Sequence, residues 1–192
     1  MKFWLVIPAA GIGSRMGADK PKQYVQVAGK SILEHSLAVF LQYPQLQAAV
    51  VALAADDPYW DSLSIAQHPQ VHPVTGGKER ADSVLAGLHY LTKIGAQPND
   101  WVLVHDAARP LLTRADLDRL LQTLAQSDVG GLLACPVRDT LKQDGGSGLS
   151  VKTLNRDGVW QALTPQMFQL QLLTKALTDA LSAGAVITDE AS

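Results

Sequence analysis

The chain has 192 residues, which is long enough for one domain with a well-filled core. Hydrophobic residues make up 47% of it and charged residues 18%, so an intrinsically disordered chain is excluded. The 16 Lys and Arg residues and the 18 Asp and Glu residues give a net charge of −2. This balance argues against a general nucleic-acid or membrane-surface binder.

Cysteine usage and the N-terminal sequence predict a reducing, cytoplasmic location. Cys135 is the only cysteine and cannot form an internal disulfide. The apolar residues 1–8 are too few for a signal peptide, and no apolar run approaches the ~18 residues that a membrane span needs. Residues 1–30 hold five Lys and Arg residues and one acidic residue, Asp19. Such a local basic patch suits a compact anionic ligand.

Short apolar runs alternate with stretches of helical periodicity along most of the chain. In chain order, the sequence predicts a strand at Phe3–Ile7, a helix at Ile32–Leu41, strands at Ala49–Leu53 and Val71–Val74, a helix at Asp82–Leu91, a strand at Trp101–His105, a helix at Ala115–Leu124 and a strand at Gly131–Pro136. Continuously apolar strands alternating with helices indicate an α/β fold, with a mostly parallel sheet covered by helices on both faces. We expect residues 1–192 to form a single domain.

Residues 137–160 depart from this alternation. A glycine-rich turn at 144–148 lies between two short polar stretches, which predicts a β-hairpin. Two strands with so little apolar surface are marginally stable alone. We therefore expect an arm that packs on another subunit; the alternative is a flexible surface excursion.

The C-terminal part of the chain contains a predicted helix, Gln169–Leu181, and a predicted strand, Ala185–Ile187. Residues 188–192, with the sequence TDEAS, then resemble the first turn of a helix, where acidic residues are favoured. A single turn is unstable because helix nucleation is costly. We therefore expect that this segment frays or that a C-terminal segment is missing.

A glycine-rich loop follows the first predicted strand, with the sequence PAAGIGSRMG at 8–17 and PKQ at 21–23. Small residues let the backbone approach a ligand, and glycine permits turns that direct several N–H groups at phosphate oxygens. Arg15 and Lys22 add two cations suited to phosphate. Met16 stands where a dinucleotide-binding fingerprint needs its third glycine, and no Walker sequence occurs. The loop therefore predicts another kind of phosphate-binding site.

A second glycine turn, GGKERADS at 76–83, leads from a predicted strand into a helix. Gly76, Gly77 and the hydroxyl of Ser83 could bind the edge of a base or a ribose. The alternative is that Ser83 only caps the helix and that Arg80 is a solvated helix residue. The motif alone does not separate these interpretations.

The sequence HDAARP at 105–110 follows the predicted strand at 101–105. Asp106 would face the first loop from a strand's carboxyl end, which is a suitable place for a Mg²⁺ ligand, because Mg²⁺ takes one or two carboxylates together with phosphate oxygens and waters. Arg109 would lie close enough for a second phosphate. We expect His105 to be structural and Thr113, rather than Asp106, to cap the next helix.

Together these motifs resemble a known family. The stretches PAAGIGSRMGADKPKQY, GGKERADSVLAGL, VHDAARP, PVRDTLK, NRDGVWQALTPQ and ITDEAS, in this order, resemble the 2-C-methyl-D-erythritol 4-phosphate cytidylyltransferases of the non-mevalonate isoprenoid pathway. The first stretch also occurs in other sugar-nucleotide transferases, but the ordered set is highly specific. The resemblance implies a Rossmann-like domain and Mg²⁺-dependent cytidylyl transfer from CTP to a sugar-alcohol phosphate. It also implies a homodimer that exchanges β-arms, with no nucleic-acid or membrane partner.

The resemblance also assigns roles to individual positions. It implies catalytic roles for Arg15 and Lys22 and a metal-binding role for Asp106. The implied CTP-binding residues are Ala9, Ala10, Gly11, Gly13, Gly76, Arg80 and Ser83. The implied acceptor-binding residues are Arg109 and Thr188, with Thr140 and Arg156 from the partner subunit's arm.

Two alternatives stay open at this point. The ribitol-5-phosphate cytidylyltransferases share the same scaffold and would differ in the acceptor. The family also continues past the ITDEAS stretch into a basic segment whose lysine is expected at the substrate phosphate. We therefore expect a truncated copy, and the second alternative is a CTP-binding module that is inactive through truncation.

Overall fold

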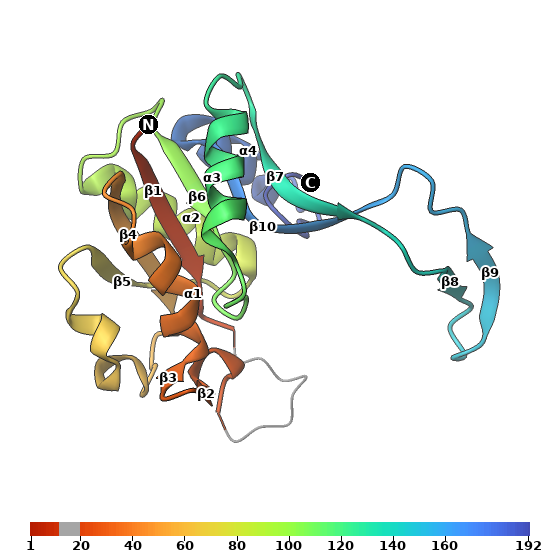
Figure 1. Ribbon diagram of the computed structural model, residues 1–192, viewed down its shortest axis with the longest axis horizontal. Helices are drawn as coiled ribbons and strands as arrows, with labels where there is room; N and C mark the ends of the chain where they lie inside the picture. The colour runs from red at the N-terminus through yellow and green to blue at the C-terminus, as the bar shows by residue number, and fades with distance from the viewer. Residues whose placement is uncertain (12–19) are drawn as a thin grey trace.

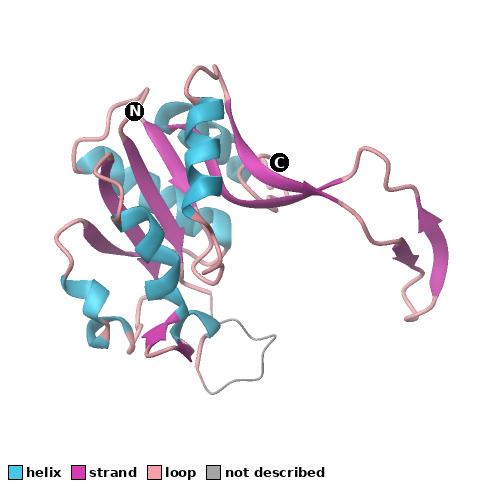
Figure 2. Cartoon of the chain, in the orientation of Figure 1, coloured by secondary structure: helices cyan, strands magenta, loops and turns pink. Residues whose placement is uncertain are grey.

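The computed structural model describes residues 1–11 and 20–192, and its centre is a six-stranded sheet. The strand order is β5-β4-β1-β6-β10-β7. The strands are β1 (Phe3–Pro8), β4 (Leu46–Leu53), β5 (Val71–Thr75), β6 (Trp101–Val104), β7 (Gly130–Pro136) and β10 (Trp160–Gln169). The helices are α1 (Ile32–Leu41), α2 (Arg80–Lys93), α3 (Arg114–Leu124) and α4 (Leu170–Ser182). Figure 2 shows them packed around the sheet.

The sheet is mostly parallel, as the alternating pattern predicts. Strand β1 pairs in parallel with β4 and β6, and β4 pairs in parallel with β5. Strand β10 is antiparallel to both of its neighbours, β6 and β7. The apolar runs identify every strand of this sheet except β10. That strand is buried from Thr164 to Phe168 but exposed at its start, and Pro165 interrupts it, so it lacks a uniform apolar run.

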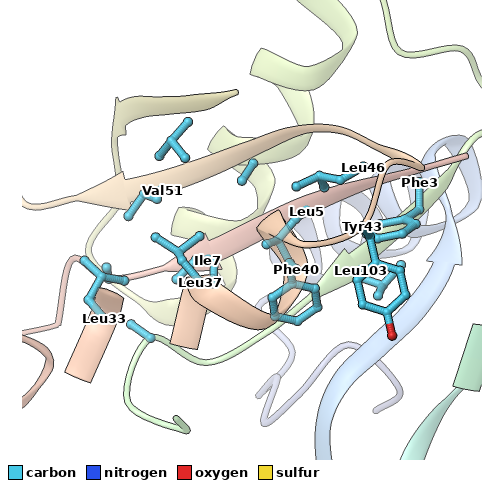
Figure 3. Packing of buried hydrophobic residues seen from close by; sticks show 14 of the residues in the cluster. Phe3, Leu5, Ile7, Leu33, Leu37, Phe40, Tyr43, Leu46, Val51 and Leu103 are labelled. Carbon is cyan, nitrogen blue, oxygen red and sulfur yellow. The ribbon is translucent and has the colours of Figure 1, made fainter. Parts of the chain in front are cut away.

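The two faces of the sheet bury separate sets of side chains. Phe3, Leu5 and Ile7 of β1 point to one face and pack with residues of α1 and α3, as Figure 3 shows for α1. Val6 of β1 points to the other face and packs with residues of α2 and α4. Alternate side chains of a strand point to opposite faces, so a fully apolar strand such as β1 requires helices on both sides.

Helix boundaries agree closely with their sequence signals. Helix α1 begins and ends at the predicted residues, and Ser31 caps it by accepting a hydrogen bond from the backbone N–H of Glu34. Helices α2 and α3 contain the predicted ranges and begin slightly earlier. Thr113 caps α3 by accepting from the N–H of Asp116 at 3.1 Å, which confirms it as the cap in place of Asp106.

Strands β7 and β10 continue beyond the sheet as a long ribbon that ends in the pair β8 (Leu141–Asp144) and β9 (Ser150–Leu154). Figure 1 shows this arm projecting away from the body of the molecule. Several of its apolar side chains are exposed in the single chain, including Leu149 at 70%, Val151 at 66% and Trp160 at 60%. The hairpin is where the sequence predicts it, and its exposed apolar residues resemble an unpartnered surface.

The end of the chain differs from the expectation. The predicted strand Ala185–Ile187 is wrong, because these residues have no strand partner and Val186 is 89% exposed. Gly184, with φ of 66°, ends α4 in a turn that leads the chain away from the sheet edges. Residues 188–192 form turns and not a helix. Two smaller strands, β2 (Gln26–Val27) and β3 (Lys30–Ser31), and the 3₁₀ helices at Lys22–Tyr24, Trp60–Ser62 and Ser64–Gln67 complete the described part of the chain.

Within that part of the chain, none of the helices combines the length and the apolar character needed to cross a membrane.

Glu34 provides a pH-dependent test of how α1 is anchored. Its carboxylate accepts hydrogen bonds from the N–H of Ser31 at 2.8 Å and from the hydroxyl of Ser64 at 2.7 Å. Burial alone would raise the pKa of Glu34, but these donors and the nearby Lys30 lower it below its ordinary value. The ionised form therefore stabilises the fold above the ordinary pKa, and this contribution is lost as the pH falls through the lowered pKa.

We expect Glu34→Gln to reduce the free energy of unfolding by roughly 1–2 kcal/mol at neutral pH. Urea unfolding should show the gap between the wild type and the variant closing as the pH falls from about 7 to about 3. A gap that stays constant over this range would show that the charge of Glu34 does not stabilise the cap.

Candidate active site

A pocket of about 650 Å³ opens where β1 and β6 end. Open α/β sheets bind ligands in crevices at the carboxyl ends of their strands. The first loop, the 3₁₀ helix Lys22–Tyr24, the start of α2 and the segment after β6 contribute its walls. The described residues that line it include Ala9, Ala10, Gly11, Lys22, Gln23, Gly77, Arg80, Ser83, Asp106 and Arg109.

Gln23 connects the first loop to the segment that carries Lys22. Its side-chain Nε2 donates to the carbonyl of Ala9 at 2.8 Å and to that of Gly11 at 3.1 Å. Gln23 is only 3% exposed, and these two bonds satisfy the donors of its buried amide group. Lys22 is held beside the loop as a consequence.

Sequence reasoning missed this role of Gln23, although the quoted Pro21-Lys22-Gln23 motif contains the residue. The available signal was an amide side chain next to a candidate phosphate-binding lysine, and its burial is visible only in the folded chain. The same short helix is anchored from its other side, because the Tyr24 hydroxyl donates to Asp57 at 2.6 Å. Burial and the neighbouring Asp57 raise the pKa of Tyr24 above its ordinary range, so it stays a donor.

The second glycine turn packs directly against the first loop. The N–H of Gly76 donates to the carbonyl of Leu53 at 2.7 Å, which extends the pairing of β4 and β5. A Cβ atom on Gly76 would lie 2.8 Å from the Cβ of Ala10, so only glycine fits without displacement. Gly76 therefore lies behind the pocket wall, and Gly77 rather than Gly76 lines the pocket.

Ser83 does not cap α2, so the capping interpretation is wrong. Its hydroxyl accepts from the N–H of Gly77 at 3.1 Å and donates to the carbonyl of Glu79 at 3.2 Å. Ser83 is 2% exposed although it contributes to the pocket wall. In this state it holds the glycine turn, and Glu79 occupies the cap position of α2.

Four charged side chains form a continuous line along the pocket, which we call the charge line: Glu190, Arg80, Asp106 and Arg109. Arg80 donates to Asp106 Oδ1 from Nε at 3.1 Å and from Nη2 at 2.9 Å. It also binds both oxygens of Glu190. Arg109 Nε donates to Asp106 Oδ2 at 2.8 Å. Arg80 is thus an ion-paired residue, and the interpretation of it as a solvated helix residue is wrong.

The charges in this line shift one another's protonation. Burial alone would raise the pKa of Asp106, but the Arg80 and Arg109 guanidinium groups hold it below its ordinary value. Asp106 is therefore ionised at neutral pH. Burial raises the pKa of Glu190, and its bonds to Arg80 oppose this effect. Glu190 is a further residue that sequence reasoning missed, since its partner is far away along the chain.

His105 is structural, as expected. It is fully buried, its Nε2 lies 3.0 Å from the Arg109 carbonyl, and its Nδ1 lies 2.9 Å from the Thr164 hydroxyl. Burial lowers the pKa of His105 to about 4, so the ring is neutral at physiological pH. The Thr164 hydroxyl also accepts from the N–H of Asp106 at 3.3 Å, which helps to fix the backbone at this point.

Some of the predicted site residues do not meet in this pocket. Thr140 and Arg156 lie on the arm, away from the pocket of their own chain, as the position of β8 and β9 in Figure 1 indicates. Thr188 is exposed and does not line the pocket. Gly13 and Arg15 lie outside the described residues.

The fold and the pocket define a class of protein. A mostly parallel α/β sheet, a glycine-rich loop after β1, a second glycine turn after β5 and an ionised carboxylate after β6 are the features of a nucleotidyltransferase. The model of the 2-C-methyl-D-erythritol 4-phosphate cytidylyltransferase (IspD) family matches residues 3–192. The chain belongs to this family.

Individual relatives agree with this assignment. The chain is 61% identical to the 2-C-methyl-D-erythritol 4-phosphate cytidylyltransferase of Ectopseudomonas mendocina, and the match covers 100% of this chain and 81% of the relative. It is 60% identical to the enzyme of the same name from Pseudomonas aeruginosa, with 99% and 81% covered.

Solved structures show the same likeness. The Francisella tularensis 2-C-methyl-D-erythritol 4-phosphate cytidylyltransferase has a TM-score of 0.85 at 35% identity, and the match covers 100% of this chain and 84% of that one. A 4-diphosphocytidyl-2C-methyl-D-erythritol synthase has a TM-score of 0.84 at 40% identity, with 99% and 82% covered.

The double hydrogen bond of Gln23 leads to a prediction about the first loop. We expect Gln23→Leu to weaken CTP binding, because the carbonyls of Ala9 and Gly11 lose their donor and the loop moves relative to Lys22. The lost bonds should also lower the free energy of unfolding by about 1–3 kcal/mol. Calorimetric titration with CTP and urea unfolding measure the two effects.

Gln70→Leu is the matched control, because the Gln70 Nε2 donates to the carbonyl of Leu46 at 2.8 Å, away from the pocket. It should lower stability without changing CTP affinity. Equal CTP affinities in the two variants would contradict a positioning role for Gln23.

Proposed function

We propose that this chain transfers the cytidylyl group of CTP to 2-C-methyl-D-erythritol 4-phosphate, a step of isoprenoid precursor biosynthesis. An oxygen of the acceptor phosphate forms a bond to the α-phosphorus of CTP. The bond from that phosphorus to the bridging oxygen breaks, and pyrophosphate leaves. The observation that carries the proposal is the pocket at the ends of β1 and β6, which combines a glycine-lined wall with Lys22, Arg80 and Arg109, in a chain of this family.

The chemistry needs little besides positioning and charge compensation. Both reactants are anions that repel each other, and the acceptor phosphate is already ionised at neutral pH. A strong general base is therefore unnecessary, which agrees with a site whose neighbouring histidine, His105, is buried and neutral. Lys22 and Arg15 are proposed to stabilise the charge that grows on the α-phosphate and on the leaving pyrophosphate.

CTP is proposed to lie between the two glycine segments. The backbone of Ala9, Ala10, Gly11 and Gly13 would bind the phosphates and ribose, and the turn at Gly76 with Ser83 and Arg80 would bind the base side. The Ser83 hydroxyl accepts from the N–H of Gly77 and donates to the carbonyl of Glu79. A contact between Ser83 and cytidine would therefore either leave these two bonds in place or replace them.

Asp106 is the proposed ligand for a divalent cation, Mg²⁺ in the first instance. No group of three or more Asp, Glu, His or Cys side chains able to hold a metal occurs among the described residues, so a cage made wholly of protein is not present there. Mg²⁺ needs only one or two carboxylates when nucleotide phosphates and water supply the other ligands. The ionised Asp106 on the pocket wall fits that requirement. Mg²⁺ would neutralise phosphate charge when bound.

The acceptor site is proposed to form between two subunits. Arg109 lines the pocket, but Thr140 and Arg156 are on the arm and cannot contribute to the pocket of their own chain in this conformation. A homodimer that exchanges arms would bring these two residues to the neighbouring pocket, where Thr188 of that pocket's own chain is proposed to join them. It would also cover the exposed apolar residues of the arm. A cytoplasmic location stays a prediction.

Pyrophosphate release tests the proposal directly. The chain is mixed with CTP and Mg²⁺ and either 2-C-methyl-D-erythritol 4-phosphate or ribitol 5-phosphate. Release with the methylerythritol substrate alone supports the proposal, and release with ribitol 5-phosphate alone contradicts the proposed acceptor. CTP binding without release from either acceptor would identify a nucleotide-binding module.

Lys22→Ala should lower kcat far more than it raises KM. Loss of one preorganised positive donor costs roughly 10²–10³ in kcat, because the donor acts mainly on charge that develops in the transition state. Steady-state kinetics with both substrates measure the effect. Lys93→Ala removes the same charge at the exposed C-terminal end of α2 and should behave as wild type. An unchanged kcat in Lys22→Ala would refute its role.

Arg156→Ala should raise KM for the acceptor and leave the CTP affinity unchanged, because the arm is expected to reach only the acceptor. Lys152→Ala, on β9 of the same arm, is the control for charge removal. Mixing Arg156→Ala chains with Lys22→Ala chains provides a second test. Exchange of arms between subunits predicts partial recovery of activity, since some mixed dimers contain one intact site. A mixture no more active than its components would contradict the shared site.

A further inference from the structure

We propose that Glu190 is a positioning residue, which acts through Arg80 to keep Asp106 available for a metal-bound nucleotide. This inference rests on the proposed function of the pocket. Glu190 comes from the turn segment after α4, far from the glycine loops in sequence. None of the motif arguments assigns it a role.

The contact between Glu190 and Arg80 has well-defined geometry. The Glu190 side chain is 1% exposed, and its two oxygens accept from Nη1 and Nη2 of Arg80, the second at 3.1 Å. A paired contact of this kind fixes the plane of the guanidinium group as well as its distance. The Nε edge of the same group faces Asp106. Arg80 is therefore held from both sides, and Glu190 fixes the side of the guanidinium group that faces away from Asp106.

A neighbouring contact docks the same segment independently. Asp189 Oδ2 accepts a hydrogen bond of 2.9 Å from Nε2 of Gln166, a residue of β10 that is 1% exposed. Glu190 thus follows a residue that is itself tied to the central sheet. The position of the Glu190 carboxylate does not depend on Arg80 alone.

The order of the charges explains how the position of Glu190 affects Asp106. Along the charge line, a carboxylate alternates with a guanidinium group, and the four formal charges sum to zero. The Arg80 guanidinium group divides its hydrogen bonds between Glu190 and Asp106. If Glu190 were uncharged, Arg80 and Arg109 would both interact with Asp106 as their carboxylate partner. Without the negative charge of Glu190, Asp106 would face two guanidinium groups, and Arg80 would have lost its second carboxylate partner. Asp106 would then be a poorer ligand for a cation that must compete with those groups.

Glu190→Gln is the central variant, because it keeps the shape of the side chain and removes the charge. We expect it to weaken CTP binding in the presence of Mg²⁺ by about 10-fold or more, in the range typical when a group supporting a metal ligand is lost. Binding without Mg²⁺ should change much less. Glu190→Asp, which keeps the charge on a shorter side chain, should restore part of the affinity. Isothermal calorimetry with and without Mg²⁺ measures these effects.

Two comparisons separate positioning from a merely structural role. Asp179→Asn removes a carboxylate from an exposed ion pair with Lys175 on α4, and it should bind CTP as the wild type does. In an Arg80→Gln background, Glu190→Gln should cause no further loss of affinity, because the residue through which it acts is already gone. Equal CTP affinity in Glu190→Gln and the wild type, with Mg²⁺ present, would overturn the inference. A further loss in the double variant would also overturn it.

The Nη–H signals of Arg80 in ¹⁵N NMR provide a readout that needs no nucleotide, because both Nη groups donate to Glu190. Release from Glu190 should speed the exchange of these protons with water in Glu190→Gln and leave it unchanged in Asp179→Asn. If the wild-type chain binds no CTP, the proposed function fails, and these signals still decide whether Glu190 holds Arg80. Identical Nη–H exchange in Glu190→Gln and the wild type would contradict the inference.

Discussion

Charge compensation at the carboxyl edge of the sheet is the constraint on which the site depends. Parallel strands deliver their C-terminal residues to one edge, and the pocket there must receive anions without repelling them. The chain places Lys22, Arg80 and Arg109 at this edge and keeps one ionised carboxylate, Asp106, among them. Two guanidinium groups lower the pKa of Asp106. The result is a pocket that can bind phosphate groups and still offer a ligand to a cation.

The buried core and a few close contacts beside the pocket hold this arrangement in place. The apolar residues of β1 are buried on both faces, so the start of the first loop is fixed by the core. Gln23 then ties the loop to Lys22, and the fit between Gly76 and Ala10 sets the distance between the two glycine segments. Each of these contacts depends on a small residue or a buried amide and not on a charged group. Packing therefore sets the geometry, and the charged side chains supply the electrostatics.

Local sequence signals predicted most of the fold. Apolar runs identified five of the strands of the central sheet, helical periodicity identified α1, and Thr113 was the expected cap of α3. Strand β10 was not predicted, because only part of it is buried and it contains Pro165. The predicted strand at 185–187 failed for the opposite reason, since a short apolar run is not a strand when no neighbouring strand is available to pair with it.

The candidate site was predictable only where its chemistry is local. The glycine segments and Asp106 follow strands directly, so their positions could be inferred from the alternating pattern. The pairing of Arg80 with Glu190 joins residues 110 positions apart, and no periodicity or motif carries that information. The role of Gln23 likewise depends on where two carbonyl groups lie after folding. The proposed roles of the arm residues Thr140 and Arg156 depend on a second subunit, which a single chain does not contain.

A structure of the chain with CTP and Mg²⁺ tests the central claim most directly. The account predicts that the triphosphate lies between the first loop and the glycine turn at 76–77, with the Lys22 ammonium at its phosphates and the Asp106 carboxylate on the cation. A nucleotide bound at another surface, with Lys22 directed into solvent and Asp106 still bound only to its two arginines, would contradict it.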